Sequence, residues 1–249
     1  MARRLFFVEK VRGEAAELQG EEARHLRRVL RAEIGQRYEL SDNQSRYLAE
    51  IDSFGKDLIR FRVLETLPDC PPPVRLTVLI SLIKFDRLEW VVEKGTELGV
   101  ERIVPVVTER SEKGLDRAAL KRIERWRRIV LESSQQCRRV TMPLVDEPLR
   151  FADAIQQEAG HRYFLEERPG AAPLFAALPE PDARHAADSV ALLTGPEGGW
   201  TDAEREMACR SGWTAVSLGR QVLRAETAAI AALAVLSNAW LATLPAQPD

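Results

Sequence analysis

Cysteine and histidine are scarce in this chain of 249 residues. The three cysteines, Cys70, Cys137 and Cys209, are odd in number and far apart, and no CxxC motif or Cys/His metal spacing occurs. The three histidines are isolated from one another. This pattern argues against a disulfide framework and against a metal site, so a reducing compartment is expected.

Long apolar runs are also absent. The longest run, Ala228–Leu236, has nine residues, whereas a membrane-spanning helix needs about 20. The segment Met1–Val8 lacks the apolar length of a secretory signal, and charge returns at Glu9. We therefore expect a cytoplasmic protein with no membrane partner.

A strong excess of one charge sign is missing as well. The net charge of −2 argues weakly against a nucleic-acid partner. Positive charge is nevertheless concentrated in two segments, since residues 117–139 contain eight basic and two acidic residues, and Arg24, Arg27, Arg28 and Arg31 form a second group. Local patches of this kind can bind RNA phosphates on an acidic protein.

Proline marks the expected domain boundary. Four prolines occur between Pro68 and Pro73, and such a segment forms a stiff, extended spacer. Residues 1–67 are expected to form a small domain, mainly of strands, with one helix over 21–30. The linker is assigned to residues 68–74. The expected strands of the first domain are 4–8, 38–40, 47–53 and 58–64.

Residues 75–249 alternate between apolar strands and helices. This alternation predicts an α/β domain with a mainly parallel sheet that is covered on both faces. The stretch 168–188 is expected to be a surface connection. The expected strands are 75–83, 102–107, 162–165, 189–194 and 214–218. The expected helices are 87–98, 115–137, 202–211 and 225–241.

The segment Thr194-Gly-Pro-Glu-Gly-Gly199 follows an expected strand and precedes an expected helix. Thr201 and Glu204 have the spacing of a capping box, which marks the helix start. The glycines permit positive φ and allow the backbone to approach a ligand, at the strand end where α/β sheets bind ligands. A plain connecting loop is the alternative. The segment is neither a Walker A loop nor a GxGxxG fingerprint.

A second short turn, from Leu218 to Arg224, also follows a strand. Burial of Arg224 and Glu226 would be costly unless they are paired or used in function. The alternative is a surface turn with an incidental ion pair. Lys84, Arg87 and the acidic residues that follow are interpreted as a solvated helix.

Several motifs together resemble the SPOUT class of methyltransferases, and specifically the ribosomal RNA small subunit methyltransferase E family. They are Arg4-Leu-Phe-Phe, His25-Leu-Arg-Arg-Val-Leu-Arg31, Lys94-Gly-Thr-Glu-Leu-Gly-Val100, Thr108-Glu-Arg-Ser111, Thr194-Gly-Pro-Glu-Gly-Gly199 and Leu218-Gly-Arg-Gln-Val-Leu-Arg-Ala-Glu-Thr-Ala228. They occur in the family's order and span nearly the whole chain. The stretch Gln136–Arg139 is aligned with a further family motif that follows the basic helix.

The resemblance implies a PUA-like β-barrel that binds RNA over residues 1–67. It also implies a SPOUT α/β methyltransferase domain with a deep trefoil knot over residues 75–249. A homodimer is implied too, and the alanine-rich helix 225–241 suits close approach of a second subunit. The implied reaction is methylation of uracil N3 in 16S rRNA of the 30S subunit, with S-adenosylmethionine as cofactor.

The chemistry of the implied reaction suggests a hypothesis for the functional residues. The expected cofactor site comprises Thr194, Gly195, Pro196, Glu197, Gly198, Gly199, Leu218, Gly219, Val222, Leu223, Thr227 and Ala228. Arg224 is expected to stabilise the uracil anion, Glu226 to orient Arg224, and Glu197 to accept the proton, although structural pairing of both glutamates with arginine is an equal alternative. The expected RNA contacts are Arg4, Arg24, His25, Arg28, Arg31, Arg110 and Arg139.

Three alternative functions remain open. One is a SPOUT enzyme that acts on transfer RNA or on a ribose 2′-hydroxyl. Another is an RNA-binding ribosome assembly factor without catalytic activity. The third is a nucleotide-dependent oxidoreductase.

Overall fold

The computed structural model describes residues 5–68 and 72–242. Arg4 and residues 69–71 of the linker lie outside this part. The chain divides into two compact units, Met1–Pro71 with Leu131–Met142, and Pro72–Val130 with Pro143–Asp249. Residues 131–142 therefore belong to the first unit, although no composition change or turn signal in this segment predicts that it leaves the second.

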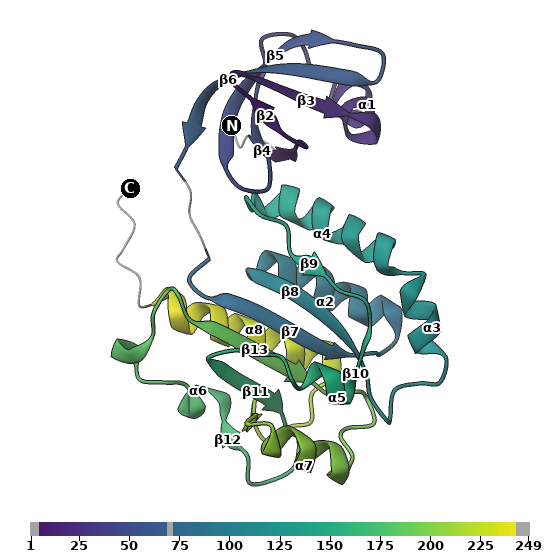
Figure 1. Cartoon of the computed structure of the whole chain (residues 1–249), viewed down its shortest axis with the longest axis vertical. Coiled ribbons are helices and arrows are strands. Elements are labelled where there is room, and N and C mark those ends of the chain that lie inside the picture. The colour runs from purple at the N-terminus through teal and green to yellow at the C-terminus, as the bar shows by residue number, and fades with distance from the viewer. Residues whose placement is uncertain (1–4, 69–71, 243–249) are drawn as a thin grey trace. The chain divides into compact units, whose positions relative to one another are not determined.

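The first unit contains a six-stranded sheet with the strand order β1-β4-β5-β6-β3-β2. Only β1 and β4 are parallel, and the other neighbours are antiparallel. Figure 1 shows this sheet as the purple and blue strands, with α1 beside one end of it. The strands are β1 (Leu5–Phe7), β2 (Val11–Arg12), β3 (Ala15–Gln19), β4 (Arg37–Ser41), β5 (Arg46–Phe54) and β6 (Leu58–Leu67).

Helix α1 (Gly20–Arg28) closes the core of this unit. Its buried residues Ala23 and Leu26 pack with Leu40, Ile51 and Phe61 of the sheet. The intervening positions carry arginines and His25, which are exposed. The apolar spacing of the segment therefore determines which face of the helix is buried.

The segment 131–142 is held in the first unit by polar contacts. The Ser41 hydroxyl donates a hydrogen bond to the Val140 carbonyl at 2.5 Å, and the Asn43 side-chain oxygen accepts one from the Met142 amide at 2.7 Å. These contacts join positions 99 residues apart, so no local sequence pattern could predict them.

The second unit contains a sheet in which every pair of neighbouring strands is parallel, with the order β10-β8-β7-β13-β11-β14-β12 and β9 beside β8. The predicted parallel α/β architecture is confirmed. The strands are β7 (Arg75–Ser81), β8 (Val100–Val107), β9 (Leu144–Val145), β10 (Leu149–Arg150), β11 (His161–Leu165), β12 (Ala172–Pro173), β13 (Ser189–Thr194) and β14 (Thr214–Ser217).

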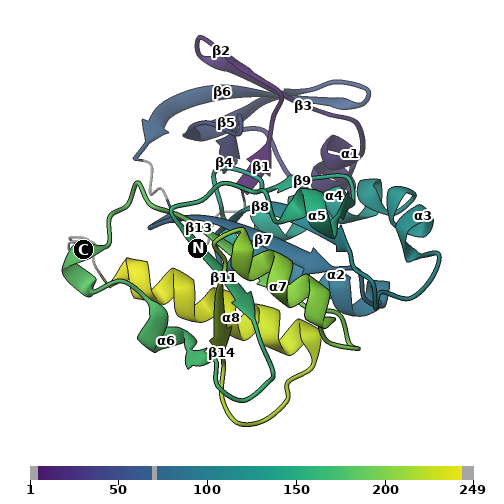
Figure 2. The same cartoon turned by 60° about the horizontal axis from the view of Figure 1, so that its bottom comes forward.

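Helices cover both faces of this sheet (Figures 1 and 2). One face packs against α5 (Phe151–Ala154) and α7 (Asp202–Arg210), in a core that includes Leu79, Leu193 and Trp213. Helices α2 (Phe85–Glu97) and α8 (Ala225–Leu241) contact each other, and they also contact β8 and β13, respectively.

Two expectations about the second unit are corrected. The helix expected over 115–137 is divided into α3 (Leu115–Leu120) and α4 (Ile123–Cys137). The break at Lys121 and Arg122 contains neither glycine nor proline, so the sequence did not mark it. The stretch 168–188 is also more structured than expected, since it contains β12, α6 (Leu174–Ala177) and a 3₁₀ turn at Pro181–Ala183.

In the part of the chain that the structure describes, no helix is both long and apolar enough to cross a membrane.

Candidate active site

A cavity of about 370 Å³ lies at the carboxyl ends of the central strands of the second unit. Strand β13 ends at Thr194 and β14 ends at Ser217, with β11 between them. The two turns that follow β13 and β14 therefore open at the same edge of the sheet, and both line the cavity. Its volume is in the range typical of small-molecule sites.

Most of the predicted cofactor residues meet in this cavity. Thr194, Gly195, Pro196, Glu197, Gly199, Leu218, Gly219, Val222, Leu223 and Ala228 line it, as does Arg224. Gly198, Thr227 and Glu226 are not among the lining residues. The end of β11 supplies Leu165, Glu166 and Glu167, which the sequence analysis missed. Their position at the end of a strand is the signal that could have identified them.

The glycine-rich turn needs its glycines at two positions. Gly199 has φ of +66°, a conformation that residues with side chains rarely adopt. A Cβ on Gly195 would lie 3.0 Å from Cε2 of the Trp200 ring. The cavity wall is therefore built from backbone at these positions, and a side chain would disturb it.

The helix that follows the turn begins as predicted. Thr201 caps α7, because its hydroxyl accepts a hydrogen bond from the Glu204 amide at 3.2 Å. The Glu204 carboxylate accepts one in return from the Thr201 amide at 2.9 Å. The other oxygen of Glu204 accepts a hydrogen bond from the Glu109 amide at 2.9 Å, so the cap also holds the loop after β8.

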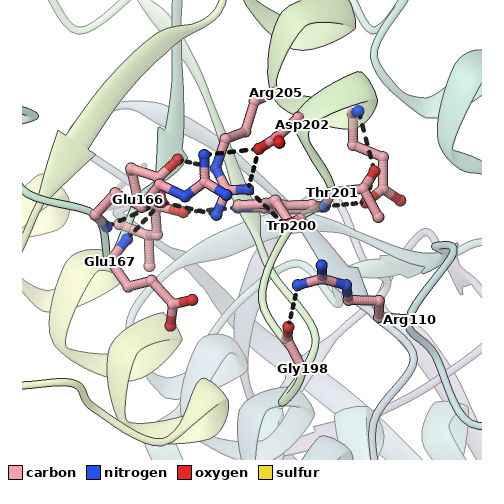
Figure 3. Close-up of polar contacts among 11 residues, drawn as sticks. Arg110, Glu166, Glu167, Gly198, Trp200, Thr201, Asp202 and Arg205 are labelled. Carbon is pink, nitrogen blue, oxygen red and sulfur yellow. Dashed lines mark hydrogen bonds and ion pairs between the residues drawn. The ribbon is translucent and has the colours of Figure 1, made fainter.

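Beside the turn, Glu166 and Arg205 form an ion pair with little exposure to solvent (Figure 3). The Arg205 Nε and Glu166 Oε2 atoms are 2.6 Å apart, and Arg205 also donates to the Trp200 carbonyl. Burial acts to raise the pKa of the Glu166 carboxyl. The hydrogen bonds from Arg205 and from the Arg168 and Glu167 amides outweigh burial, so the pKa is lowered.

Arg110 supports the turn from its other side. Its guanidinium donates a hydrogen bond to the Gly198 carbonyl at 2.8 Å, as Figure 3 shows. A Cβ on Gly198 would lie 3.3 Å from the Cβ of Arg110. Arg110 was expected to contact RNA, and this role stays a prediction; in the structure its side chain contacts the glycine-rich turn.

Arg87 connects two carboxylates at the cavity. Its guanidinium donates a hydrogen bond to Glu197, and its Nε lies 3.9 Å from Oε1 of Glu226. Glu226 is thus paired with Arg87. No hydrogen bond or ion pair joins it to Arg224 among the described residues. The side chain of Arg224 is exposed, and Arg224 stands at the N-cap position of α8.

One polar atom of the cavity lacks a protein partner. The Thr194 hydroxyl oxygen is buried and makes no hydrogen bond with the described residues. Thr194 is at the end of β13 and lines the cavity. Because buried hydroxyls normally have a partner, this atom fits a ligand with a hydrogen-bonding group. The backbone-lined turns fit a flat heterocycle whose edge forms hydrogen bonds with backbone amide and carbonyl groups.

The predicted RNA-binding residues fall in both units. Arg24, His25 and Arg28 are exposed on α1, and Arg31 follows with φ of +51°. Arg139 belongs to the segment 131–142 of the first unit. A separate hollow in the first unit has four basic residues among those that line it, Arg24, Arg27, Arg28 and Lys56.

Comparison with known families identifies the chain. An RNA methyltransferase domain model matches residues 70–237, and an RNA methyltransferase PUA domain model matches residues 18–64. The ribosomal RNA small subunit methyltransferase E of Bacillus subtilis is 30% identical, with 93% of this chain and 95% of that protein covered. The chain belongs to the ribosomal RNA small subunit methyltransferase E family.

Further relatives of this methyltransferase agree. The enzyme of the same name from Mycobacterium tuberculosis is 32% identical over 96% of this chain and 94% of its own length. The crystal structure of the Neisseria gonorrhoeae enzyme, bound to S-adenosylmethionine, matches with a TM-score of 0.83 and 28% identity, and covers 96% and 98% of the two chains. A Legionella pneumophila methyltransferase in complex with the same cofactor matches with a TM-score of 0.84 and 29% identity, over 96% and 98%.

The family that the sequence motifs indicated is therefore confirmed, and so is the PUA-type first unit. The Glu166–Arg205 pair of the methyltransferase was missed, and Arg87, which was interpreted as part of a solvated helix, lines the cavity and pairs with Glu197. Arg87 meets its partners over separations of 110 and 139 residues, and no spacing rule predicts such contacts.

Proposed function

We propose that this enzyme transfers the methyl group of S-adenosylmethionine to N3 of a uridine in 16S rRNA of the 30S subunit. The observation that carries the proposal is the convergence of the two strand-end turns on one cavity in a member of this methyltransferase family. The cavity's volume, its backbone-lined wall and the Thr194 hydroxyl without a partner support the cofactor assignment. Gly198 and Thr227 are proposed to support the site from outside its wall.

The chemistry follows from what each residue can do. The cofactor, when bound, supplies an activated methyl group, and the protein positions the acceptor and excludes water. Uracil N3 must lose a proton, and Arg224 is proposed to stabilise the resulting negative charge. Its exposed side chain at the cavity supports this role. Glu197 is the proposed proton acceptor, since its carboxylate lines the same cavity.

The first unit is proposed to hold the RNA. Arg24, His25, Arg28 and Arg31 gather on and after α1, and exposed cations of this kind bind phosphates. Arg4 and Arg139 are proposed as further contacts. The target base has to be single-stranded or turned out of its stack to reach the cavity.

A homodimer with a trefoil-knotted methyltransferase domain is part of the proposal. The partly exposed side of α8 is apolar, with Ile230, Ala231, Ala234 and Val235, which supports a surface that a second subunit covers. Sedimentation velocity tests this point, and a monomer at micromolar concentration would contradict it. The ribosomal substrate also implies that the enzyme works in the cytoplasm.

The decisive experiment incubates the protein with labelled S-adenosylmethionine and purified 30S subunits that lack the modification. We expect label in 16S rRNA, and mass spectrometry of the digested RNA should identify N3-methyluridine. Free 16S rRNA and bulk transfer RNA are the parallel substrates. Label in transfer RNA, or in a ribose 2′-O-methyl group, would overturn the substrate assignment. Tight binding to 30S subunits without any transfer would instead indicate an assembly factor.

A further inference from the structure

Arg87 stands where three separate segments of the second unit meet. It belongs to the first turn of α2, and its side chain lines the cavity. Glu197 comes from the glycine-rich turn, and Glu226 from the first turn of α8. One guanidinium therefore contacts carboxylates of the two elements that border the cofactor cavity.

The ion pair between Arg87 and Glu226 matters because Glu226 is buried. The side chain is only 9% exposed, and its Oε2 atom is buried without a hydrogen-bond partner among the described residues. A buried carboxylate is costly unless a cation compensates for it. In the described part of the chain, Arg87 is the only cation within ion-pairing distance of Glu226. The positive end of α8 adds a smaller favourable effect, because Glu226 is in the first turn.

The geometry of the contact requires arginine. A guanidinium presents Nε and Nη atoms in a rigid plane and can donate to two groups in different directions. Here Nη1 faces Glu197 and Nε faces Glu226. A lysine ammonium keeps the charge, but it is a single point on a flexible stem, so it cannot hold both carboxylates in a fixed geometry.

We infer that Arg87 is a positioning residue of the methyl-transfer site, which ties the glycine-rich turn to the start of α8 and so sets the shape of the cofactor cavity. The inference rests on the proposed function. It also explains why Arg224 is available for the substrate, because Glu226 is already occupied by Arg87. Arg87 acts on the cofactor through Glu197 and Glu226 and has no assigned contact with the reacting atoms.

The test measures S-adenosylmethionine binding by isothermal titration calorimetry, in the absence of RNA, for the wild type and for Arg87→Gln and Arg87→Lys. We expect Arg87→Gln to raise the Kd about tenfold or more, and Arg87→Lys to raise it about threefold, since a charge-assisted contact is lost in the first and loosened in the second. In methyl-transfer assays the KM of Arg87→Lys for S-adenosylmethionine should rise in parallel with its Kd. A role in folding alone would lower the active fraction and leave the Kd of the folded molecules unchanged.

Two further variants distinguish a direct effect of Arg87 on cofactor binding from an effect of misfolding. Arg125→Gln is the matched control, because Arg125 also pairs with a carboxylate of α2, Glu89, but does not line the cavity. Its Kd should equal that of the wild type. If Arg87→Gln does not fold, the double variant Arg87→Gln/Glu226→Gln removes the uncompensated carboxylate and should fold, with the cofactor still bound weakly.

The outcomes distinguish this inference from the proposed function. Wild-type affinity in Arg87→Gln, with transfer to 30S subunits intact, overturns the role of Arg87 alone. An enzyme that binds the cofactor but methylates another RNA overturns the substrate assignment and leaves the role of Arg87 standing. A wild type that does not bind S-adenosylmethionine overturns both.

Discussion

Two arginine–glutamate networks flank the glycine-rich turn, and they are built differently. In the first, which we call the Glu166 network, the Glu166 carboxylate accepts hydrogen bonds from the Glu167 and Arg168 amides and two from Arg205. In the second, the Arg87 network, Arg87 contacts Glu197 and Glu226, and one oxygen of Glu226 has no partner among the described residues.

The number of satisfied hydrogen bonds distinguishes a network that stabilises the fold from one that serves the methyl-transfer site. A saturated network fixes the backbone around it, and its loss is felt as a loss of stability. The Glu166 network holds the end of β11 and the start of α7 in this way. The Arg87 network leaves one buried oxygen of Glu226 without a partner among the described residues, and its other members, Arg87 and Glu197, line the cavity. Unsatisfied buried atoms are a poor support, and they are often found near sites that receive a ligand. We therefore expect the first network to govern folding and the second, with its neighbour Arg224, to govern activity.

The largest effect is expected for Arg224→Ala. Loss of the cation that stabilises the developing uracil anion should lower the methyl-transfer rate about a hundredfold to a thousandfold. The free energy of unfolding should not change, because the exposed Arg224 side chain makes no ion pair within the described residues. A single-turnover assay on 30S subunits measures the rate.

Arg220→Ala is the matched control for this change. Arg220 is an exposed arginine of the same turn that does not line the cavity, so its removal should leave the rate at saturating substrate near that of the wild type. An equal fall in both variants would mean that net charge, and not position, accounts for the effect.

The next largest effect concerns the Glu166 network. Glu166→Gln leaves Arg205 without its charged partner, and the free energy of unfolding should fall by about 3 kcal/mol. Urea denaturation at pH 7 measures this value. Glu206→Gln is the control, because Glu206 pairs with Arg210 on the exposed side of α7, and it should cost about 0.5 kcal/mol or less. Equal losses in the two variants would remove the distinction between the networks.

The pH dependence of stability sharpens the same comparison with a smaller effect. The folded-state pKa of Glu166 is lowered below its ordinary value of 4.5, so the stability that this carboxylate provides is fully present above about pH 5. It is lost as the pH falls from 4.5 toward the folded-state pKa. Urea denaturation of the wild type between pH 7 and pH 4 should show this decline. Glu166→Gln should show a shallower one, and identical slopes would contradict the assignment.

Much of this site could be predicted from the sequence, because its signals are local. The glycine-rich turn and the Thr201–Glu204 capping box occupy consecutive positions, and the strand before them is a plain apolar run. The two networks could not be predicted, since Arg87 and Arg205 reach partners 39 to 139 residues away. Sequence proximity predicts a pairing of Glu226 with Arg224, two residues away, whereas in the fold Glu226 pairs with Arg87.

The fold shows the same division. The alternation of apolar strands and helices predicted the parallel sheet of the second unit. In the first unit β3 was missed, because its sequence Ala-Ala-Glu-Leu-Gln consists of residues that favour helices. Pairing with β6 over five positions makes this segment a strand. The assignment of residues 131–142 to the first unit depends on distant partners, including Ser41 and Asn43, that no propensity describes.

The smallest effect is expected at the Thr201–Glu204 cap of α7. Thr201→Ala removes the hydroxyl that accepts a hydrogen bond from the Glu204 amide. This loss should lower the free energy of unfolding by about 1 kcal/mol. Thr201→Ser keeps the hydroxyl, so its free energy of unfolding should stay close to that of the wild type. Neither variant should alter the Kd for S-adenosylmethionine, because Thr201 does not line the cavity. A weaker affinity in Thr201→Ala would mean that the cap shapes the cavity as well, and that support and function are not separated in this turn.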